Sequence, residues 1–377
     1  EIESTLLEHD AVQNAVAVVK TDQASQAQLV AYVQIDPDWK ESKDEFDTND
    51  QQLDKWQIVW DETYKSNANL NEDDLSGWLS TYSGQPIEKA EMLRWTDEIG
   101  CGTGLLLTRL APHVAHYTGV DFSASVLGKL NSRIQLMGIQ NVKLECKQAN
   151  EFSTDLYKQF DTIIINSVSQ YFPNIEYFVD VITKAIESIT DGGHLFLGDL
   201  RIQGMQKIQH LSVAHFQHPD ETSSESLRKL TENSIQQEEE LVVDLALFAV
   251  LQSRLKRIQR VESIIKYNSD NNEMCKFRTD VVIHVGPSQS EAKFKPEKSL
   301  DYTGVAFDDN QLKGLLSEGA ESVLIRNLPN TRLKEDSALF DQVFQNQNEI
   351  EIDRKVYDVT HDIMALSGNA SDLLRNI

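Results

Sequence analysis

A glycine-rich loop that opens an alternating pattern is the feature that most constrains how this chain can fold. The loop reads Glu98-Ile99-Gly100-Cys101-Gly102-Thr103-Gly104, and an apolar, helix-compatible run follows it. Glycine adopts backbone conformations closed to other residues and lets a ligand approach the main chain. Beyond the loop, the runs at residues 142–146, 160–165 and 194–198 predict strands, and an amphipathic stretch at residues 175–189 predicts a helix. Such alternation predicts an α/β fold with a mainly parallel sheet. Two later runs, at residues 261–266 and 277–285, predict an antiparallel pair at the end of the sheet.

The spacing of the glycines indicates which ligand the loop would hold. It follows G-x-G-x-G with a glutamate before the first glycine, whereas the dinucleotide fingerprint is G-x-G-x-x-G. Both differences favour S-adenosylmethionine over a nicotinamide dinucleotide. We therefore expect Glu98, Gly100, Cys101, Gly102 and Gly104 to contribute to a cofactor site, with Cys101 as a small packing residue rather than a nucleophile. The alternative is a tight strand-to-helix turn that binds no ligand.

Polar residues follow the next three predicted strands, where such a cofactor would lie. Asp121 ends a short strand, and an acidic residue there can accept hydrogen bonds from both ribose hydroxyls. Phe122 follows directly, and Asn150 and Glu151 close the third strand, where an adenine edge would lie. Asn166 ends the fourth strand, beside the switch point at which open sheets bind ligands. The simpler interpretation of Asp121 is a helix N-cap.

A family resemblance makes the prediction more specific. Residues 161–173, DTIIINSVSQYFP, resemble the signature of N-methyltransferase domains embedded in nonribosomal peptide synthetases. Residues 192–201, 237–241 and 272–278 are similar to later motifs of the same family, and the resemblance covers roughly residues 53–335. It implies a class I, Rossmann-like methyltransferase that uses S-adenosylmethionine and releases S-adenosylhomocysteine. The implied reaction is N-methylation of the α-amine of an aminoacyl thioester carried on a peptidyl carrier domain.

The first residues carry a second resemblance. The apolar runs at residues 15–19 and 29–33 predict two short strands, and residues 1–36 look like the small C-terminal subdomain of an adenylation domain. In this family the methyltransferase is inserted into that subdomain, which implies two partners, an adjacent adenylation domain and an aminoacyl-phosphopantetheinyl carrier domain. The predicted organisation is an adenylation fragment, a linker, a helical aromatic lead-in or lid, a methyltransferase core and a C-terminal α/β extension, at residues 1–36, 37–52, 53–97, 98–290 and 291–377.

Four candidate catalytic residues lie after the fourth and fifth predicted strands: Gln170, Tyr171, Asp199 and Arg201. Tyr171 could line the methyl-transfer cavity or could be a packed aromatic side chain. Asp199 and Arg201 could hold the amine or the pantetheine amide, or could pair with each other. The run at residues 238–240, three glutamates, is most simply a solvated face of a helix that spans residues 227–255.

The implied chemistry needs little from the protein beyond alignment. A free α-amine has a pKa of about 7.7–8.0, so a strong base is unnecessary. No metal site and no Ser-His-Asp or Cys-His cluster is visible in the sequence. We interpret His194 as a strand residue, and His210, His215 and His218 as surface residues rather than bases.

One departure from the family leaves alternatives open. Residues 93–98, LRWTDE, are not the continuous apolar run that a buried first strand requires. A degenerate, non-catalytic scaffold within the synthetase is therefore one alternative, and S-adenosylmethionine binding would discriminate between the two. A carbon or oxygen methyltransferase of the same assembly-line type is another alternative, which differs only in its acceptor.

Composition excludes several other functions. The formal net charge is −25, which argues against nucleic acid or an anionic membrane as a partner. Three cysteines give no disulfide framework. No apolar run approaches the ~20 residues that span a bilayer, and no signal peptide is visible. We expect a cytoplasmic piece of a larger protein.

Overall fold

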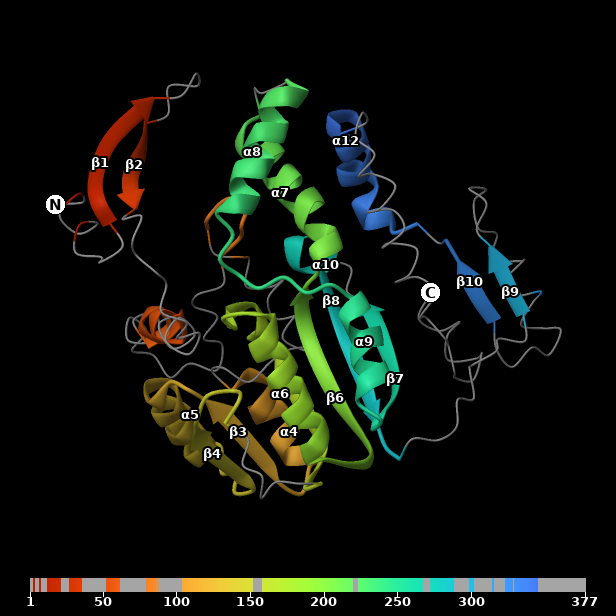
Figure 1. Ribbon diagram of the computed structural model, residues 1–377. Coiled ribbons are helices and arrows are strands. Elements are labelled where there is room, and N and C mark those ends of the chain that lie inside the picture. Colours follow the sequence, from red (N-terminus) through yellow and green to blue (C-terminus); the bar gives the residue numbers. More distant parts are fainter. Residues whose placement is uncertain are drawn as a thin grey trace. The chain divides into compact units, whose positions relative to one another are not determined.

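The computed structural model is shown in Figure 1. It describes most of the chain between residues 104 and 287 and shorter stretches elsewhere. The described residues are 3, 7, 12–21, 27–35, 52–61, 79–85, 87, 104–151, 158–219, 223–266, 272–287, 298–301, 314, 323–327 and 329–344. The chain divides into two compact units, Glu1–Gln51 and Gln52–Ile377.

The first unit contains an antiparallel pair of strands. They are β1 (Val12–Thr21) and β2 (Ala27–Ile35), with Ala17 opposite Ala31 and an irregularity near the start of β1. The carboxylate of Glu3 accepts a hydrogen bond from the backbone N–H of Ala17 at 2.9 Å. Both predicted strands are thus confirmed.

The second unit contains the sheets that position the candidate site. A four-stranded sheet has the order β5-β6-β8-β7, in which β5 and β6 are parallel and β8 is antiparallel to both of its neighbours. A parallel pair, β3-β4, is separate from it within the described part of the chain, and a further parallel pair joins β9 to β10. The strands are β3 (Tyr117–Asp121), β4 (Val142–Cys146), β5 (Phe160–Asn166), β6 (Ile189–Arg201), β7 (Ile258–Ile265), β8 (Arg278–Val285), β9 (Lys298–Asp301) and β10 (Val323–Arg326).

These strands agree with the sequence patterns that predicted them. The run at 142–146 is β4, the run at 160–165 begins β5, and the predicted antiparallel pair at the end of the sheet is β7 and β8. A first strand before the glycine loop would fall at residues 88–103, which lie outside the described residues.

Helices lie beside the four-stranded sheet and beside the β3-β4 pair (Figure 1). They are residues 52–61, α4 (Leu105–Leu110), α5 (Ala124–Leu136), α6 (Ile175–Ser188), α7 (Gln203–Gln217), α8 (Ser224–Gln236), α9 (Ala246–Arg254), α10 (Glu273–Phe277) and α12 (Lys334–Phe344), with short 3-10 turns η1 (Ala111–His113), η3 (Ser169–Tyr171) and η4 (Thr331–Leu333). On α6, Val181 and Ile182 pack with Leu195 and Leu197 of β6 in the main core. Leu130 of α5 packs near the β3-β4 pair.

The predicted helix at residues 227–255 is wrong as one continuous element. Helix α8 ends at Gln236 and α9 begins only at Ala246. Between them the backbone N–H of Leu241 donates to the carbonyl of Gln170 at 2.7 Å, and that of Val243 donates to the carbonyl of Arg201 at 2.8 Å. Because these N–H groups donate to other elements, they cannot form the hydrogen bonds of a continuous helix. We call residues 237–245 the acidic segment.

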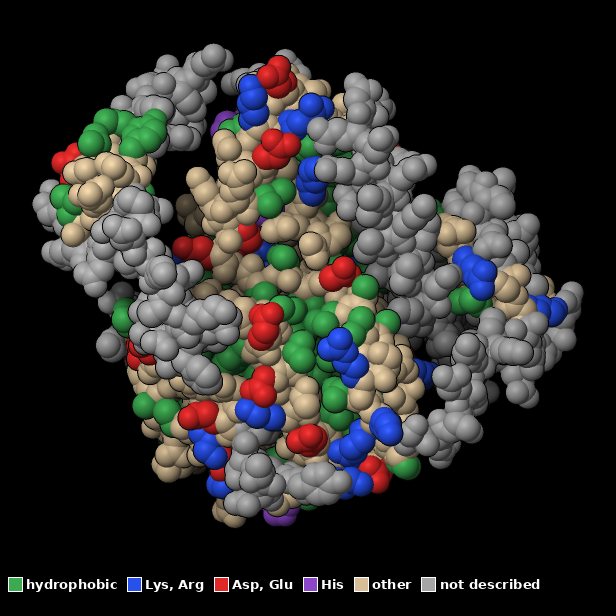
Figure 2. Space-filling view, viewed as in Figure 1, with side chains coloured by type: hydrophobic (Ala, Val, Ile, Leu, Met, Phe, Trp, Pro, Cys, Tyr) green, Lys and Arg blue, Asp and Glu red, His purple; other side chains and the backbone are tan. Residues whose placement is uncertain are grey.

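Charged side chains are dispersed on the face shown in Figure 2. Lys and Arg side chains lie among Asp and Glu side chains rather than in one continuous patch. The described part of this face therefore offers no extended positive surface to a phosphate backbone. Among the described residues, no helix is both long enough and apolar enough to span a bilayer.

Candidate active site

The end of β3 places the carboxylate of Asp121 in a largely buried position. Its Oδ1 accepts a hydrogen bond at 2.8 Å from the backbone N–H of Ser123, the N-cap of α5. Burial raises the pKa of Asp121 to about 6, although the Ser123 N–H opposes this and the nearby Asp61 adds to it. Ser123, not Asp121, is the N-cap. The simpler interpretation of Asp121 as a cap is therefore wrong, and its carboxylate remains available to a ligand.

Asn150 and Glu151 lie in the turn after β4. The Tyr177 hydroxyl donates to Oδ1 of Asn150 at 3.2 Å, and Nζ of Lys184 donates to the Asn150 carbonyl at 3.0 Å. Glu151 is exposed and accepts a hydrogen bond from the backbone of Gln148 at 2.8 Å. The turn is thereby fastened to α6, which carries both Tyr177 and Lys184.

Only the last glycine of the loop belongs to the described residues. Gly104 has φ +86, and a Cβ there would lie 2.1 Å from the side chain of Leu130. This position therefore needs glycine for both its conformation and its packing. Glu98, Gly100, Cys101 and Gly102 lie outside the described residues, so their predicted roles stay predictions. Phe122 follows Asp121, and its carbonyl accepts a contact from Sγ of Cys146 at 3.5 Å.

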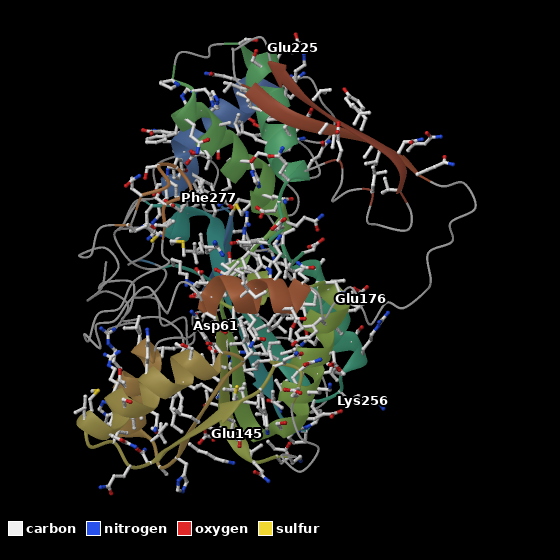
Figure 3. The ribbon with its side chains drawn as sticks, turned by 90° about the vertical axis from the view of Figure 1, so that its left-hand side faces the viewer. Asp61, Glu145, Glu176, Glu225, Lys256 and Phe277 are labelled. Atoms are coloured by element: carbon white, nitrogen blue, oxygen red, sulfur yellow. The ribbon has the colours of Figure 1, made fainter. Side chains whose placement is uncertain are left out.

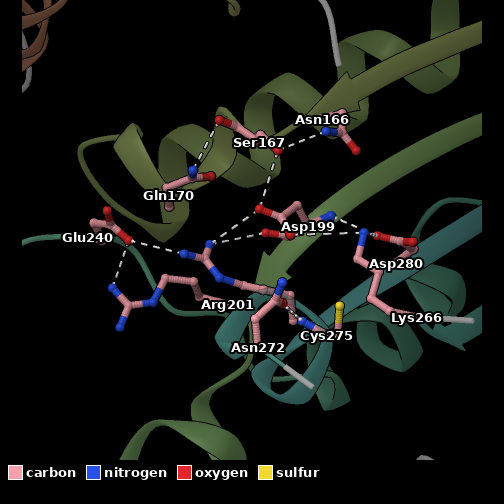
Figure 4. A network of polar contacts seen from close by, with 11 residues as sticks. Asn166, Ser167, Gln170, Asp199, Arg201, Glu240, Lys266, Asn272, Cys275 and Asp280 are labelled. Carbon is pink, nitrogen blue, oxygen red and sulfur yellow. Dashed lines mark hydrogen bonds and ion pairs between the residues drawn. The ribbon is translucent and has the colours of Figure 1, made fainter. Parts of the chain in front are cut away.

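Three predicted residues converge at the end of β5 around Ser167. Nδ2 of Asn166 donates to the Ser167 hydroxyl at 2.8 Å, and Nε2 of Gln170 donates to the Ser167 carbonyl at 3.0 Å. The Ser167 hydroxyl donates to Oδ2 of Asp199 at 3.3 Å (Figure 4). Asn166 and Gln170 are both almost fully buried. The structure thus brings together Asn166, Gln170 and Asp199.

The backbone at this point is strained on both adjacent strands. Ser167 has φ +54 and Asp199 has φ +64, in the left-handed region that non-glycine residues rarely adopt. The pairing of β6 with β8 is irregular between Leu197 and Leu200, which is where Asp199 lies. Left-handed residues cost free energy and cluster at functional sites. Two of them side by side favour a ligand site at this edge.

A buried ion pair holds Asp199 in its strained conformation. Oδ1 of Asp280 accepts hydrogen bonds from the backbone N–H of Asp199 at 2.8 Å and from Nζ of Lys266 at 2.6 Å. Nζ of Lys266 also lies 3.9 Å from Oδ1 of Asp199, and Nη1 of Arg278 lies 3.7 Å from its Oδ2. Burial raises the pKa of Asp280 even though Lys266 opposes the shift.

Arg201 does not pair with Asp199, contrary to one of the predicted alternatives. Its guanidinium instead contacts two glutamates of the acidic segment, Glu238 and, at 2.8 Å, Glu240. Burial would raise the pKa of Glu238, yet contacts with His210 and Arg201 lower it to about 2. The interpretation of residues 238–240 as a solvated helix face is therefore wrong, because two of the three side chains bind Arg201.

The aromatic helix at residues 52–61 packs against the same edge. The ring of Tyr171 lies with its centroid 4.7 Å from that of Trp56 and 5.4 Å from that of Trp60. Asp61 at the end of this helix accepts a hydrogen bond from the Ser123 hydroxyl. Figure 3 shows this helix crossing above β3, β4 and α5, with Asp61 labelled. It therefore contacts both the Asp121 end of the site and the Tyr171 end.

The predicted surface position of His210 is wrong. Its Nδ1 lies 2.7 Å from the Ser234 hydroxyl, its Nε2 lies 3.3 Å from Oε2 of Glu238, and its side chain is largely buried. Nδ1 of His218 lies 3.0 Å from the carbonyl of Ala214, so this histidine ends α7. His194 lies in β6, as predicted, with its ring against that of His284.

Sequence reasoning missed four partners of these residues: Ser167, Glu240, Lys266 and Asp280. Lys266 ends one predicted strand and Asp280 lies inside another, at residues 277–285, and a single charge beside apolar residues is a weak signal. Ser167 and Glu240 lie inside segments that resemble the family, so their proximity to the candidates could have been noticed. The sequence does not show the irregular pairing of β6 with β8 near Asp199, where the partners of Asp199 meet.

The arrangement fits the adenosine-containing cofactor that the glycine loop predicts. Asp121 has a second carboxylate oxygen for a ribose hydroxyl. Oδ1 of Asn166 and Oε1 of Gln170 are buried acceptors without a hydrogen-bond partner among the described residues. Buried acceptors that lack a partner within the protein are rare, and a ligand or a water molecule commonly supplies the missing hydrogen bond. The described residues can thus bind polar groups of a ligand at the ends of β3 and β5.

Comparison with known proteins identifies the class first. Residues 98–195 match the family described as a methyltransferase domain. With the α/β fold, the match makes this chain an S-adenosylmethionine-dependent methyltransferase of the class I kind. N-methyltransferase NodS from Bradyrhizobium japonicum is a solved structure that it resembles at a TM-score of 0.38, with 14% identity over 61% of this chain and 97% of that one.

Two curated relatives narrow the class. The chain is 32% identical over 371 residues to chondramide synthase cmdD of Chondromyces crocatus, which covers 90% of this chain and 9% of that protein. It is 31% identical over 359 residues to beauvericin nonribosomal cyclodepsipeptide synthetase BEA1 of Gibberella fujikuroi, covering 87% of this chain and 11% of that one. Over most of its length this chain is thus similar to segments of large synthetases, and residues 98–195 are the part of it that matches a methyltransferase domain. It spans about a tenth of the length of these two relatives.

Proposed function

We propose that this chain transfers the methyl group of S-adenosylmethionine to the α-amine of an aminoacyl thioester held on a carrier domain. The observation that carries the proposal is the pair of buried acceptors, Oδ1 of Asn166 and Oε1 of Gln170, which have no hydrogen-bond partner in the part of the chain that the structure describes. A neutral primary amine has two N–H donors to offer them. A hydroxyl has one donor and a carbon nucleophile has none, so the site favours nitrogen over oxygen or carbon.

In this proposal, one end of the site binds the cofactor and the other end binds the acceptor amine. At the end of β3, Asp121 accepts hydrogen bonds from the ribose of the cofactor, which supplies an electrophilic methyl group when it is bound. At the ends of β5 and β6, Asn166 and Gln170 orient the amine through its N–H groups. Ser167 and Asp199 hold these two amides in place. Alignment of this kind can supply most of the rate of a displacement reaction.

Tyr171 lines this site as a neutral side chain. Burial and then the nearby Glu240 raise its pKa well above the ordinary value of 10.0. The phenol therefore stays protonated at neutral pH and does not take a proton from the amine. Together with Trp56 and Trp60 it excludes water from the amine, which favours its neutral, nucleophilic form.

The partners follow from the same proposal. An aminoacyl-phosphopantetheinyl carrier domain delivers the acceptor, and an adjacent adenylation domain selects the amino acid, as the likeness to large synthetases supports. A cytoplasmic location and the absence of nucleic-acid and membrane partners remain predictions that belong to this proposal.

Two assays test the proposed function. Calorimetric titration with S-adenosylmethionine separates an enzyme from a non-catalytic scaffold, because the scaffold does not bind the cofactor. Mass spectrometry then follows methylation of aminoacyl-pantetheine, with the matching hydroxyacyl-pantetheine as the control. We expect an increase of one methyl group in the amino compound alone. Methylation of the hydroxyacyl compound would instead identify an oxygen methyltransferase.

A further inference from the structure

Glu240 in the acidic segment has the most exposed side chain of the four acids in this network, which are Asp199, Glu238, Glu240 and Asp280. Both of its cation contacts use Oε2, which lies 2.8 Å from Nη1 of Arg201 and 3.9 Å from Nη2 of Arg278. Oε1 has no hydrogen-bond partner among the residues that the structure describes. The side chain is 26% exposed, compared with 6% for Arg201 and 0% for Asp199. A ligand can therefore reach it.

Glu240 also lies beside the predicted catalytic residues. The backbone N–H of the next residue, Leu241, donates to the Gln170 carbonyl at 2.7 Å. Glu240 is, after burial, the largest influence on the pKa of Tyr171 and exceeds that of Asp199. Its carboxylate thus acts on Tyr171, and its backbone runs beside that of Gln170.

Apart from His210, which contacts Glu238, the network contains one more carboxylate than it contains Lys and Arg side chains. Asp199, Asp280, Glu238 and Glu240 face three cations, Lys266, Arg278 and Arg201. In Figure 4, Glu240 and Lys266 lie at opposite ends of this network.

The excess charge is most accessible at Glu240, because the other three acids are more deeply buried beside their cations. Asp280 and Asp199 face Lys266 deep in the fold, at 2.6 and 3.9 Å. Glu238 contacts Arg201 and also lies 3.3 Å from His210. A net negative site with one accessible carboxylate suits a ligand that carries or develops positive charge.

We propose that Glu240 is a catalytic residue whose Oε1 lies beside the amino group of the acceptor and acts on it through its negative charge, while the amides of Asn166 and Gln170 accept the two N–H groups; this rests on the proposed function. During transfer the nitrogen lone pair forms the bond to the methyl carbon while the carbon–sulfur bond breaks, and that electron pair remains on sulfur. Positive charge moves onto the nitrogen, which then loses one proton to solvent. A fixed carboxylate beside the nitrogen stabilises this charge as it develops.

The test compares three single variants of the full chain: Glu240→Gln, Glu239→Gln and Glu238→Gln. Glutamine keeps a carbonyl that can accept the Arg201 hydrogen bond but removes the charge. Glu239 is the matched control, because its largely exposed side chain pairs with Lys55 at 2.6 Å rather than with the network. Glu238→Gln removes a charge from the same network without removing a free carboxylate oxygen. Each variant is assayed for kcat and KM with aminoacyl-pantetheine, for S-adenosylmethionine affinity and for thermal unfolding.

We expect kcat/KM for Glu240→Gln to fall roughly 10- to 100-fold, as for loss of a hydrogen bond to a charged group. Cofactor affinity and melting temperature should stay unchanged, and Glu239→Gln should match the wild type. An equal loss in Glu238→Gln, or a loss of cofactor binding or folding in Glu240→Gln, would overturn the assignment, as would full activity of Glu240→Gln. A wild-type chain that binds the cofactor but methylates no amine would overturn the proposed function itself.

Discussion

The amide of Asn166 on β5 occupies the space above Gly198 on the neighbouring strand β6. A Cβ at Gly198 would lie 1.6 Å from Oδ1 of Asn166 and 2.6 Å from its Cγ. The two residues are paired across the parallel strands. Glycine at this position therefore allows the Asn166 side chain to lie flat over β6, next to the left-handed Asp199.

Gly198→Ala should abolish methyl transfer because the new methyl group must displace the Asn166 amide. Overpacking of this kind costs about 1–3 kcal/mol of unfolding free energy. Denaturant unfolding and the pantetheine assay measure the two effects. Gly128→Ala is the control, because Gly128 lies in α5 and a Cβ added there would meet nothing within 4 Å, and helical alanine is favourable. Full activity of Gly198→Ala would show that the position of Asn166 is unimportant.

Cofactor affinity should depend on pH through Asp121. Its pKa is raised from 3.8 to about 6, so the carboxylate is ionised above pH 6 and gains a proton as the pH falls through that value. Protonation removes an acceptor, and binding of S-adenosylmethionine should weaken below about pH 6. The raised pKa also means that Asp121 favours folding below its ordinary pKa and that this contribution is lost as the pH rises through 6.

Asp121→Ala should weaken cofactor binding by about 1–3 kcal/mol, the cost of losing the partner of buried polar groups. Asp121→Asn should remove the pH dependence while retaining a side chain of the same size. Calorimetric titrations above and below pH 6 measure both effects. An unchanged affinity in Asp121→Ala would exclude this residue from the cofactor site.

The buried Lys266–Asp280 pair should be more sensitive to single than to double substitution. Lys266→Met leaves Asp280 without its buried cation, and breaking such a pair costs about 3–5 kcal/mol. The double variant Lys266→Met with Asp280→Leu removes both charges and should recover much of the unfolding free energy. Denaturant unfolding of the single and double variants forms a thermodynamic cycle. Strictly additive losses would show that the two side chains are not coupled.

The aromatic contact between the helix at residues 52–61 and Tyr171 should contribute to stability. Trp60→Ala removes a ring that packs on Tyr171 and near Leu127. We expect a loss of about 1–3 kcal/mol, which is in the range typical of point substitutions. Ile58→Ala on the same helix is the control, because Ile58 is 60% exposed, and its unfolding free energy should change by less than about 0.5 kcal/mol. Equal effects of the two substitutions would mean that the Trp60 contact is energetically unimportant.

The elements that could be predicted from sequence are those whose pattern is local. The apolar runs that became β4 and β5, and the amphipathic stretch that became α6, carry their own periodicity. Asp121 could be singled out because a polar residue ends a short strand directly after the glycine loop. Asn166, Gln170 and Asp199 were candidates for similar reasons, and the structure brings them together around Ser167.

What could not be predicted depends on contacts between distant segments. Helical periodicity continues through residues 237–245, yet ion pairs with Arg201 and backbone bonds to Gln170 and Arg201 prevent a helix there. The left-handed backbone of Asp199 depends on Asp280, which is 81 residues away. Helix and strand propensities of single residues do not reveal contacts between distant segments, and such tertiary contacts outweigh these propensities.

The acidic segment has a consequence for anyone who exchanges modules between synthetases. Glu240 and Leu241, which follow β6 in the sequence, contact Arg201 and Gln170. The helix at residues 52–61, which precedes the glycine loop in the sequence, contacts Tyr171. A transferred segment limited to residues 98–195 would therefore contain Asp121 and Asn166. It would lack Asp199, Arg201, the acidic segment and the helix at residues 52–61. Functional exchange requires a segment that begins before residue 52 and continues past β8.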